Sequence, residues 1–186
     1  MIDRTGARSS TWCGGLWVSY RNKTYVAFAS EDITYYRLMT AWVKNENIGF
    51  NFFNAHDLYE ARDTSSVETI RGRLRERLKN AKQVVFIGSE TGKKKADDGR
   101  SFLWYEAKTI IEFDLPVVIA NHDGDRTIDR NFIPDQFLSD DYYTCSVSFQ
   151  PALIAFALDN YAVNYSESGK SGPHFYTEDK YGKLGI

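Results

Sequence analysis

Short apolar runs alternate with stretches of helical periodicity along most of the chain. Five runs are short enough to be buried strands, at residues 24–29, 50–53, 83–87, 116–120 and 144–149. Between them, apolar residues recur at the spacing of one helix face. Strands that alternate with helices predict a parallel sheet that is covered by helices on both faces.

Four helices are expected around these strands. The first has its apolar stripe at i, i+3, i+4, i+7 and i+8, formed by Tyr35, Leu38, Met39, Trp42 and Val43. The second begins at a capping box of Ser65 and Glu68. The third covers 101–113, and the last covers 151–161 with proline in its first turn. Residues 88–100 and 121–139 are expected as polar connections.

The order of elements favours an α/β, flavodoxin-like three-layer sandwich. A central, mainly parallel sheet of five strands closes most naturally in the order 2-1-3-4-5. We expect an N-terminal arm at 1–22, one domain at 23–165, and a C-terminal tail or edge at 166–186. Ligands bind such sheets outside the carboxyl ends of the strands, which points to the loops at 29–32, 54–64, 88–100 and 121–131.

Composition narrows the possible partners. The net charge is −2, whereas nucleic-acid-binding proteins usually carry a basic excess. No apolar run reaches the roughly 18 residues of a membrane span, and no secretory signal pattern is visible. Cys13 and Cys145 form no Cys-x-x-Cys pair, so we expect two reduced thiols, a cytoplasmic location and no zinc site. The histidines show no metal-ligand spacing.

Glu106 is the most informative position for chemistry. Its neighbours on the same helix face are nearly all apolar, namely Phe102, Leu103, Thr109 and Ile110. Burying an ionised carboxylate without partners costs several kcal/mol, and desolvation raises its pKa. Glu106 is therefore either a rim residue that reaches solvent or an arginine, or a carboxylate in a cleft at the carboxyl edge of the sheet.

Several stretches of the chain resemble the TIR-like family, and more narrowly the branch that includes the TIR subunit of the Thoeris anti-phage system. They are T-Y-V-A-F-A-S-E-D-I (24–33), F-F-N-A-H-D-L (52–58), R-L-K-N-A (77–81), V-V-F-I-G-S-E-T (84–91), F-L-W-Y-E-A (102–107) and L-P-V-V-I-A (115–120). The resemblance covers about 23–121. It implies the flavodoxin-like sheet, and for many members an enzyme that hydrolyses or cyclises NAD⁺ and releases nicotinamide.

The resemblance also assigns roles to residues. Glu106 matches the family's catalytic glutamate, and Phe102 takes the place of an aromatic residue, often tryptophan, four positions earlier; Trp104 is offset by two. The loop 54–64 corresponds to a loop that gates the pocket and mediates self-association. Candidate substrate-binding residues are Phe28, Ala29, Ser30, Asp57, Ser89, Phe102 and Tyr105. The aromatic members of this set could stack on rings of NAD⁺ or pack in the core.

The resemblance leaves three functions open. The first is an NAD⁺-consuming enzyme without a separate cofactor, whose nucleotide product is sensed by a downstream effector. The second is a non-catalytic interaction module, which would not need a carboxylate in a cleft. The third is an enzyme similar to nucleoside deoxyribosyltransferases, which would act on free nucleosides and ignore NAD⁺.

Overall fold

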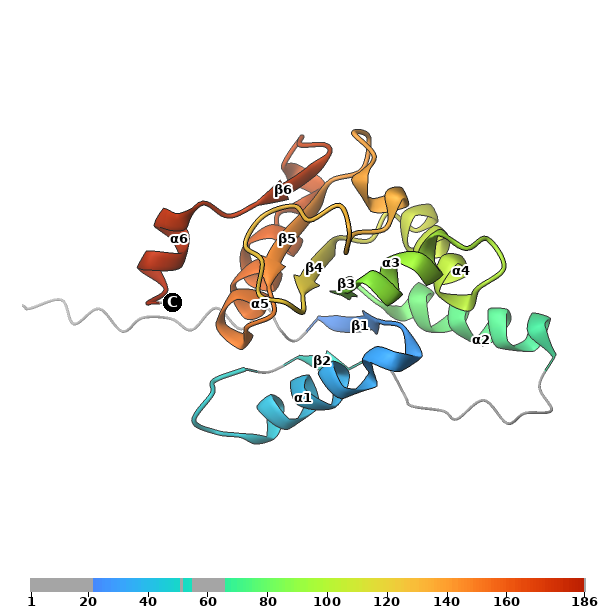
Figure 1. The fold of residues 1–186 in the computed structure, drawn as a ribbon, viewed down its shortest axis with the longest axis horizontal. Helices are drawn as coiled ribbons and strands as arrows, with labels where there is room; N and C mark the ends of the chain where they lie inside the picture. Colours follow the sequence, from blue (N-terminus) through green and yellow to red (C-terminus); the bar gives the residue numbers. More distant parts are fainter. Residues whose placement is uncertain (1–21, 51, 55–65, 186) are drawn as a thin grey trace, which may run out of the picture.

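One parallel sheet organises the molecule (Figure 1). The computed structural model describes residues 22–50, 52–54 and 66–185. In them the sheet has six strands in the order β2-β1-β3-β4-β5-β6, and all neighbours are parallel. The strands are β1 Lys23–Ala27, β2 Phe53–Asn54, β3 Gln83–Gly88, β4 Val117–Asn121, β5 Thr144–Ser148 and β6 Pro173–Phe175. The expected α/β class with a parallel sheet is confirmed.

The sixth strand corrects the expectation of five. β6 has only three residues, begins with Pro173, and pairs with β5 so that His174 lies opposite Cys145. A proline is tolerated at an edge, where one side of the strand makes no ladder. So short a segment has no apolar run of its own, and only its pairing to β5 defines it as a strand.

Helices cover both faces of the sheet, as Figure 1 shows. α1 (Ile33–Lys44), α5 (Pro151–Ala157) and α6 (Glu178–Lys183) contribute to the core on one face, and α2 (Val67–Asn80), α3 (Glu90–Asp97) and α4 (Phe102–Glu112) to the core on the other. β3 serves both cores, because Val84 and Phe86 point to one face while Val85 and Ile87 point to the other. This is why its sequence is apolar throughout.

Short helices complete the connections. In the described part of the chain, 3-10 helices cover Ser30–Asp32, Asp135–Leu138 and Tyr165–Glu167, and a π-helix, Leu158–Ala162, continues α5. Within the described residues, no helix is long and apolar enough to cross a membrane. Cys145 is a buried free thiol, whereas Cys13 and most of the expected N-terminal arm lie outside the described residues.

The segment 88–100 is not the loop that we expected. It contains α3, whose N-cap Ser89 accepts a hydrogen bond from the backbone N–H of Gly92 at 2.8 Å. α3 buries only Gly92 and Ala96, so it has no stripe of large apolar residues that a sequence pattern could detect. A side chain at position 92 would lie 2.9 Å from Ser89 Oγ, so glycine allows the close approach.

Two details of α1 and α2 also differ from expectation. α1 buries Tyr36 and Met39, while Leu38 is 43% exposed, so the buried face is rotated relative to the predicted stripe. The N-cap of α2 is Ser66, whose Oγ accepts from the Thr69 N–H at 3.2 Å. The predicted capping box is therefore wrong, because the helix begins one residue later than it requires; Ser65 itself lies outside the described residues.

Candidate functional site

A cleft of about 490 Å³ lies beyond the carboxyl end of β1, against α3 and α4. Its lining comes from three places in the chain: the turn after β1, the end of α3 with the connection that follows it, and the first turns of α4. The lining residues are Phe28, Ala29, Ser30, Lys95, Asp98, Ser101, Phe102, Leu103 and Glu106. A volume of this size is typical of small-molecule sites.

The beginning of α4 directs its side chains into this cleft. Ser101 is the N-cap, and its Oγ accepts from the Trp104 N–H at 2.9 Å. The Ser101 hydroxyl also donates to the carbonyl of Lys95, which joins the start of α4 to α3. Phe102, at 38% exposure, and buried Glu106 lie one turn apart, and both line the cleft.

Glu106 is a buried carboxyl group with one strong partner. The Tyr25 hydroxyl donates a hydrogen bond to Glu106 Oε1 at 2.8 Å. Burial raises the pKa of Glu106 to about 7, because desolvation disfavours the charged form. The hydrogen bond from Tyr25 and the positive charge of Arg77 act in the opposite direction. Of the two interpretations of Glu106, the geometry favours the cleft carboxylate.

An ion pair lies at the edge of the cleft. Lys95 Nζ donates to both carboxylate oxygens of Glu31, at 2.6 and 2.8 Å, and to Ser30 Oγ at 3.0 Å. The hydrogen bond from Lys95 lowers the pKa of Glu31 to about 2. The turn after β1 is therefore tied to α3 by charge, and the Lys95 cation, which belongs to the lining itself, contacts the lining residue Ser30.

The cleft brings together five of the predicted site residues: Phe28, Ala29, Ser30, Phe102 and Glu106. The lining formed by described residues does not include Ser89 or Tyr105. Ser89 is buried, caps α3, and donates to Asp32 Oδ2 at 2.5 Å. Tyr105 faces α2, where the Arg71 guanidinium lies 5.4 Å from its ring centre. Asp57 and most of the loop 54–64 lie outside the described residues.

The site residues predicted from the sequence do not include Lys95, Asp98 or Tyr25. Lys95 and Asp98 fall in a segment that was expected to be a loop. Tyr25 resembles any other residue of a buried strand. A buried tyrosine hydroxyl, however, usually needs a hydrogen-bond partner, and this requirement could have pointed to a polar group near Tyr25. Within the described residues, no group of three His, Cys, Asp or Glu side chains could hold a metal ion.

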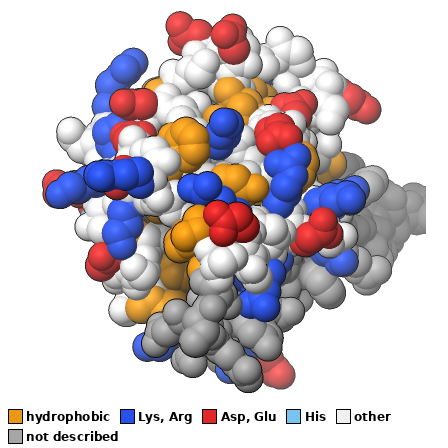
Figure 2. Space-filling view, turned by 90° about the vertical axis from the view of Figure 1, so that its right-hand side faces the viewer, with side chains coloured by type: hydrophobic (Ala, Val, Ile, Leu, Met, Phe, Trp, Pro, Cys, Tyr) orange, Lys and Arg blue, Asp and Glu red, His pale blue; other side chains and the backbone are white. Residues whose placement is uncertain are grey.

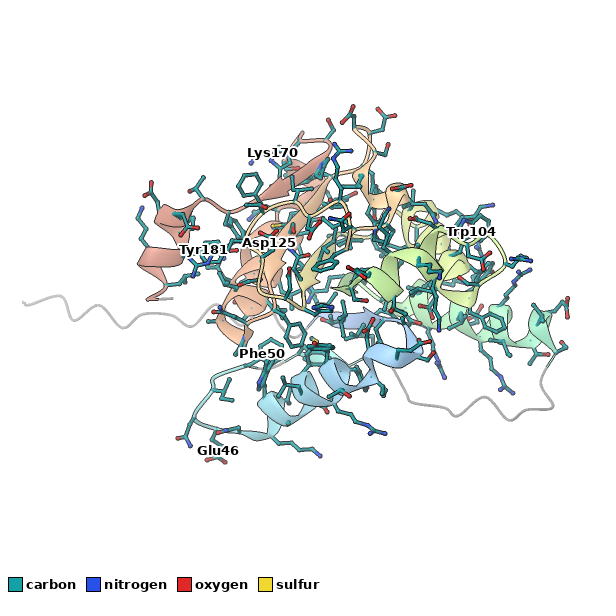
Figure 3. All side chains as sticks on the ribbon, in the orientation of Figure 1. Glu46, Phe50, Trp104, Asp125, Lys170 and Tyr181 are labelled. Atoms are coloured by element: carbon teal, nitrogen blue, oxygen red, sulfur yellow. The ribbon has the colours of Figure 1, made fainter. Side chains whose placement is uncertain are left out.

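The surroundings of the cleft are mixed in charge. Figure 2 views the end of the molecule that carries α2 and α4 and shows Lys and Arg side chains interspersed with Asp and Glu. Trp104 projects from α4 at this end, whereas Tyr181 lies at the opposite end (Figure 3). The Lys108 ammonium is 5.2 Å from the Trp104 ring centre, so this tryptophan packs with a neighbouring lysine while Phe102 faces the cleft.

Comparison with known protein families gives a match that includes this cleft. Residues 19–126 match the family described as Thoeris protein ThsB, TIR-like domain. The matched region is more than half of the chain; it contains β1, β3, β4 and every described residue of the cleft lining. The resemblance seen in the sequence motifs is thereby confirmed. The chain belongs to the ThsB TIR-like domain family of the Thoeris anti-phage defence system.

Proposed function

We propose that this chain cleaves the nicotinamide–ribose bond of NAD⁺ and forms a linear or cyclic ADP-ribose product that a downstream Thoeris effector senses. The observation that carries the proposal is Glu106, a buried carboxyl group that lines a cleft of small-molecule size. Membership in the ThsB family supports the link to anti-phage signalling. The cleft lies at the carboxyl end of the sheet, where parallel α/β folds bind their ligands.

The proposed reaction needs the kind of group that Glu106 provides. Cleavage of the bond passes through a state in which positive charge develops on the ribose, as in glycoside hydrolysis. A carboxylate held beside the ribose stabilises this charge and can accept hydrogen bonds from ribose hydroxyls. Nicotinamide leaves as a neutral ring, so the departure needs no strong general acid. One carboxylate therefore suffices for the step that breaks the bond.

The other lining residues have proposed parts in binding. Phe102 lies one turn before Glu106 and is partly exposed, so its ring can stack on a ring of the substrate. Phe28 follows β1 and contributes a second aromatic ring to the lining. Ala29 and Ser30 offer backbone groups at the end of the strand. Access of water to the cleft would decide between hydrolysis and cyclisation.

The test compares wild type with Glu106→Gln, which keeps the size of the side chain and removes its charge. Each protein is incubated at high concentration with NAD⁺, and nicotinamide and ADP-ribose products are followed by chromatography. We expect product formation to fall about a hundredfold or more in the variant, because a stabilising group is lost from the transition state. The mass and retention of the product separate hydrolysis from cyclisation.

A matched control is available on the same helix. Glu112→Gln makes the same change in α4, but Glu112 is exposed and pairs with Arg75 at 2.5 Å. We expect this variant to retain activity within about twofold, as for surface positions away from a site. If wild type forms no product from NAD⁺, even in lysate from phage-infected cells, the result favours a non-catalytic interaction module over an enzyme. Turnover of free nucleosides but not of NAD⁺ would instead favour the deoxyribosyltransferase-like function.

A further inference from the structure

Tyr25 joins the sheet to the candidate catalytic residue. It lies in β1, is fully buried, and donates its hydroxyl proton to Glu106 Oε1 in α4 at 2.8 Å. Within the described residues, this is the only hydrogen bond that the Glu106 carboxyl group makes. Because Oε1 is held and no described residue donates a hydrogen bond to Oε2, a ligand in the cleft would meet Oε2.

The position of the Tyr25 hydroxyl is set by packing. The ring lies in the core between the sheet and the helices α2 and α4, together with Leu78, Ala107 and Ile110. Side chains in such a core have little rotational freedom. Burial and the nearby negative charge of Glu106 hold the pKa of the phenol well above its ordinary value, so the hydroxyl remains a donor at neutral pH.

We propose that Tyr25 is a positioning residue for Glu106: its hydroxyl fixes Oε1, stabilises the ionised carboxylate, and leaves Oε2 to meet the ribose. This inference rests on the proposed NAD⁺ cleavage for its catalytic consequence, but the effect of Tyr25 on the Glu106 carboxyl group can be measured without any substrate.

Other charged groups also face Glu106. Arg77 approaches from α2, and its positive charge favours the carboxylate. On the cleft side, Lys95 from α3 and Asp98 from the following connection belong to the same lining. These groups remain when Tyr25 is changed, so the expected effect of the change is partial. Because none of these groups changes in the Tyr25 variant, a shift of the Glu106 pKa in that variant reports the lost hydroxyl itself.

The variant Tyr25→Phe removes the hydroxyl and keeps the ring. The Glu106 carboxyl carbon is followed by ¹³C NMR as the pH is varied, and its resonance is assigned with Glu106→Gln. We expect the midpoint to rise by roughly one unit, because hydrogen bonds to charged groups are strong. In turnover of NAD⁺, we expect kcat to fall about tenfold with little change in KM, and the acid limb of the pH profile to move to higher pH.

Tyr142→Phe is the matched control. Tyr142 is also buried in the same core, and its hydroxyl donates to the backbone carbonyl of Leu115, away from the cleft. We expect this variant to lose a similar amount of stability, while the Glu106 midpoint and the pH profile stay unchanged. An unchanged midpoint in Tyr25→Phe, or the same shift in both variants, would overturn the inference.

A second measurement, on wild type and Glu106→Gln, tests the inference if Tyr25→Phe does not fold. In wild type, a buried hydroxyl proton shared with a carboxylate gives a slowly exchanging, downfield ¹H resonance, and we expect it to move upfield in Glu106→Gln. Absence of that resonance, or its indifference to Glu106→Gln, would contradict the inference. If the Glu106 midpoint shifts in Tyr25→Phe but wild type never consumes NAD⁺, only the proposed function is contradicted.

Discussion

The same chemical pair, a tyrosine hydroxyl and a carboxylate, occurs at two opposite ends of the sheet. At the carboxyl end, Tyr25 donates to Glu106 Oε1 at 2.8 Å, and both residues are buried. At the amino end, Tyr165 donates to Asp114 Oδ1 at 2.6 Å, and Asp114 is exposed. Asp114 also has φ +50°, in the left-handed region that aspartate tolerates better than most residues.

The difference between the two pairs lies in their surroundings. Solvent screens the Asp114 pair, which contributes mainly to the shape of the turn between α4 and β4. Around Glu106, burial raises the pKa of the carboxyl group to about 7, and the hydrogen bond from Tyr25 counteracts this effect. A short distance between two groups therefore says little about function until burial is known. The presence of a cleft does not separate the two pairs, because Glu106 lines the cleft at the carboxyl end while Asp114 and Tyr165 line another hollow at the amino end; burial of the carboxyl group does.

The largest expected contrast is in activity. Glu106→Asp keeps the charge but withdraws the carboxylate by one methylene, so we expect kcat for NAD⁺ to fall about a hundredfold, as for other small misplacements of a catalytic group. Asp114→Asn, at the other pair, should stay within about twofold of wild type. Nicotinamide release at pH 8 measures both. A Glu106→Asp enzyme with nearly full activity would show that the position of the carboxylate is not critical.

The second contrast is in stability as a function of pH. The folded pKa of Glu106, about 7, lies above its ordinary value of 4.5, so the folded state holds this proton more tightly than the unfolded state. The resulting stability is complete at low pH and is lost as the pH rises through about 7. Between pH 4 and pH 8, wild type should therefore lose roughly 3 kcal/mol of its free energy of unfolding through this group. Glu106→Gln should not lose this contribution, because glutamine does not titrate.

Urea unfolding at the two pH values measures this difference. Asp114→Asn is unfolded under the same conditions as a control. It shows how far replacing an exposed carboxylate by an amide changes the pH dependence of the free energy of unfolding. A difference between wild type and Glu106→Gln that does not depend on pH would mean that the carboxyl group is better solvated than its burial indicates.

The smallest effects are expected at the exposed pair itself. Tyr165→Phe removes one hydrogen bond and should lower the free energy of unfolding by about 0.5–1 kcal/mol. Asp114→Asn keeps an oxygen acceptor and a residue that tolerates positive φ, so it should change stability by less than about 0.5 kcal/mol. Chemical denaturation at neutral pH separates these values. A larger loss in either variant would indicate that this pair is more buried than the structure shows.

Much of the framework can be predicted from the sequence because it follows from local patterns. The strand at 83–87 is apolar throughout because both of its faces are buried, and this pattern is visible in any window around it. The carboxylate of Glu106 is conspicuous for the opposite reason, since it interrupts an apolar helix face. These two signals led to the sheet, to the edge where ligands bind, and to the central residue of the cleft.

Other parts depend on contacts between distant segments. α3 buries only small residues, and β6 is defined by its pairing to β5, so neither has a pattern of its own. The buried face of α1 is rotated from the predicted stripe, because several spacings are compatible with one helix and packing selects among them. Ser89, expected near the substrate, is instead used to cap α3 and to bind Asp32.

The sequence by itself determined the class of fold, the family, and the helix face on which Glu106 lies, because hydrophobic periodicity and short motifs are properties of neighbouring residues. Only the tertiary structure decided that Tyr25 meets Glu106 across 81 positions of the chain, and that Lys95 reaches the same cleft. Burial, and with it the raised pKa of Glu106, arises when separate segments exclude water together, and no local pattern contains that information.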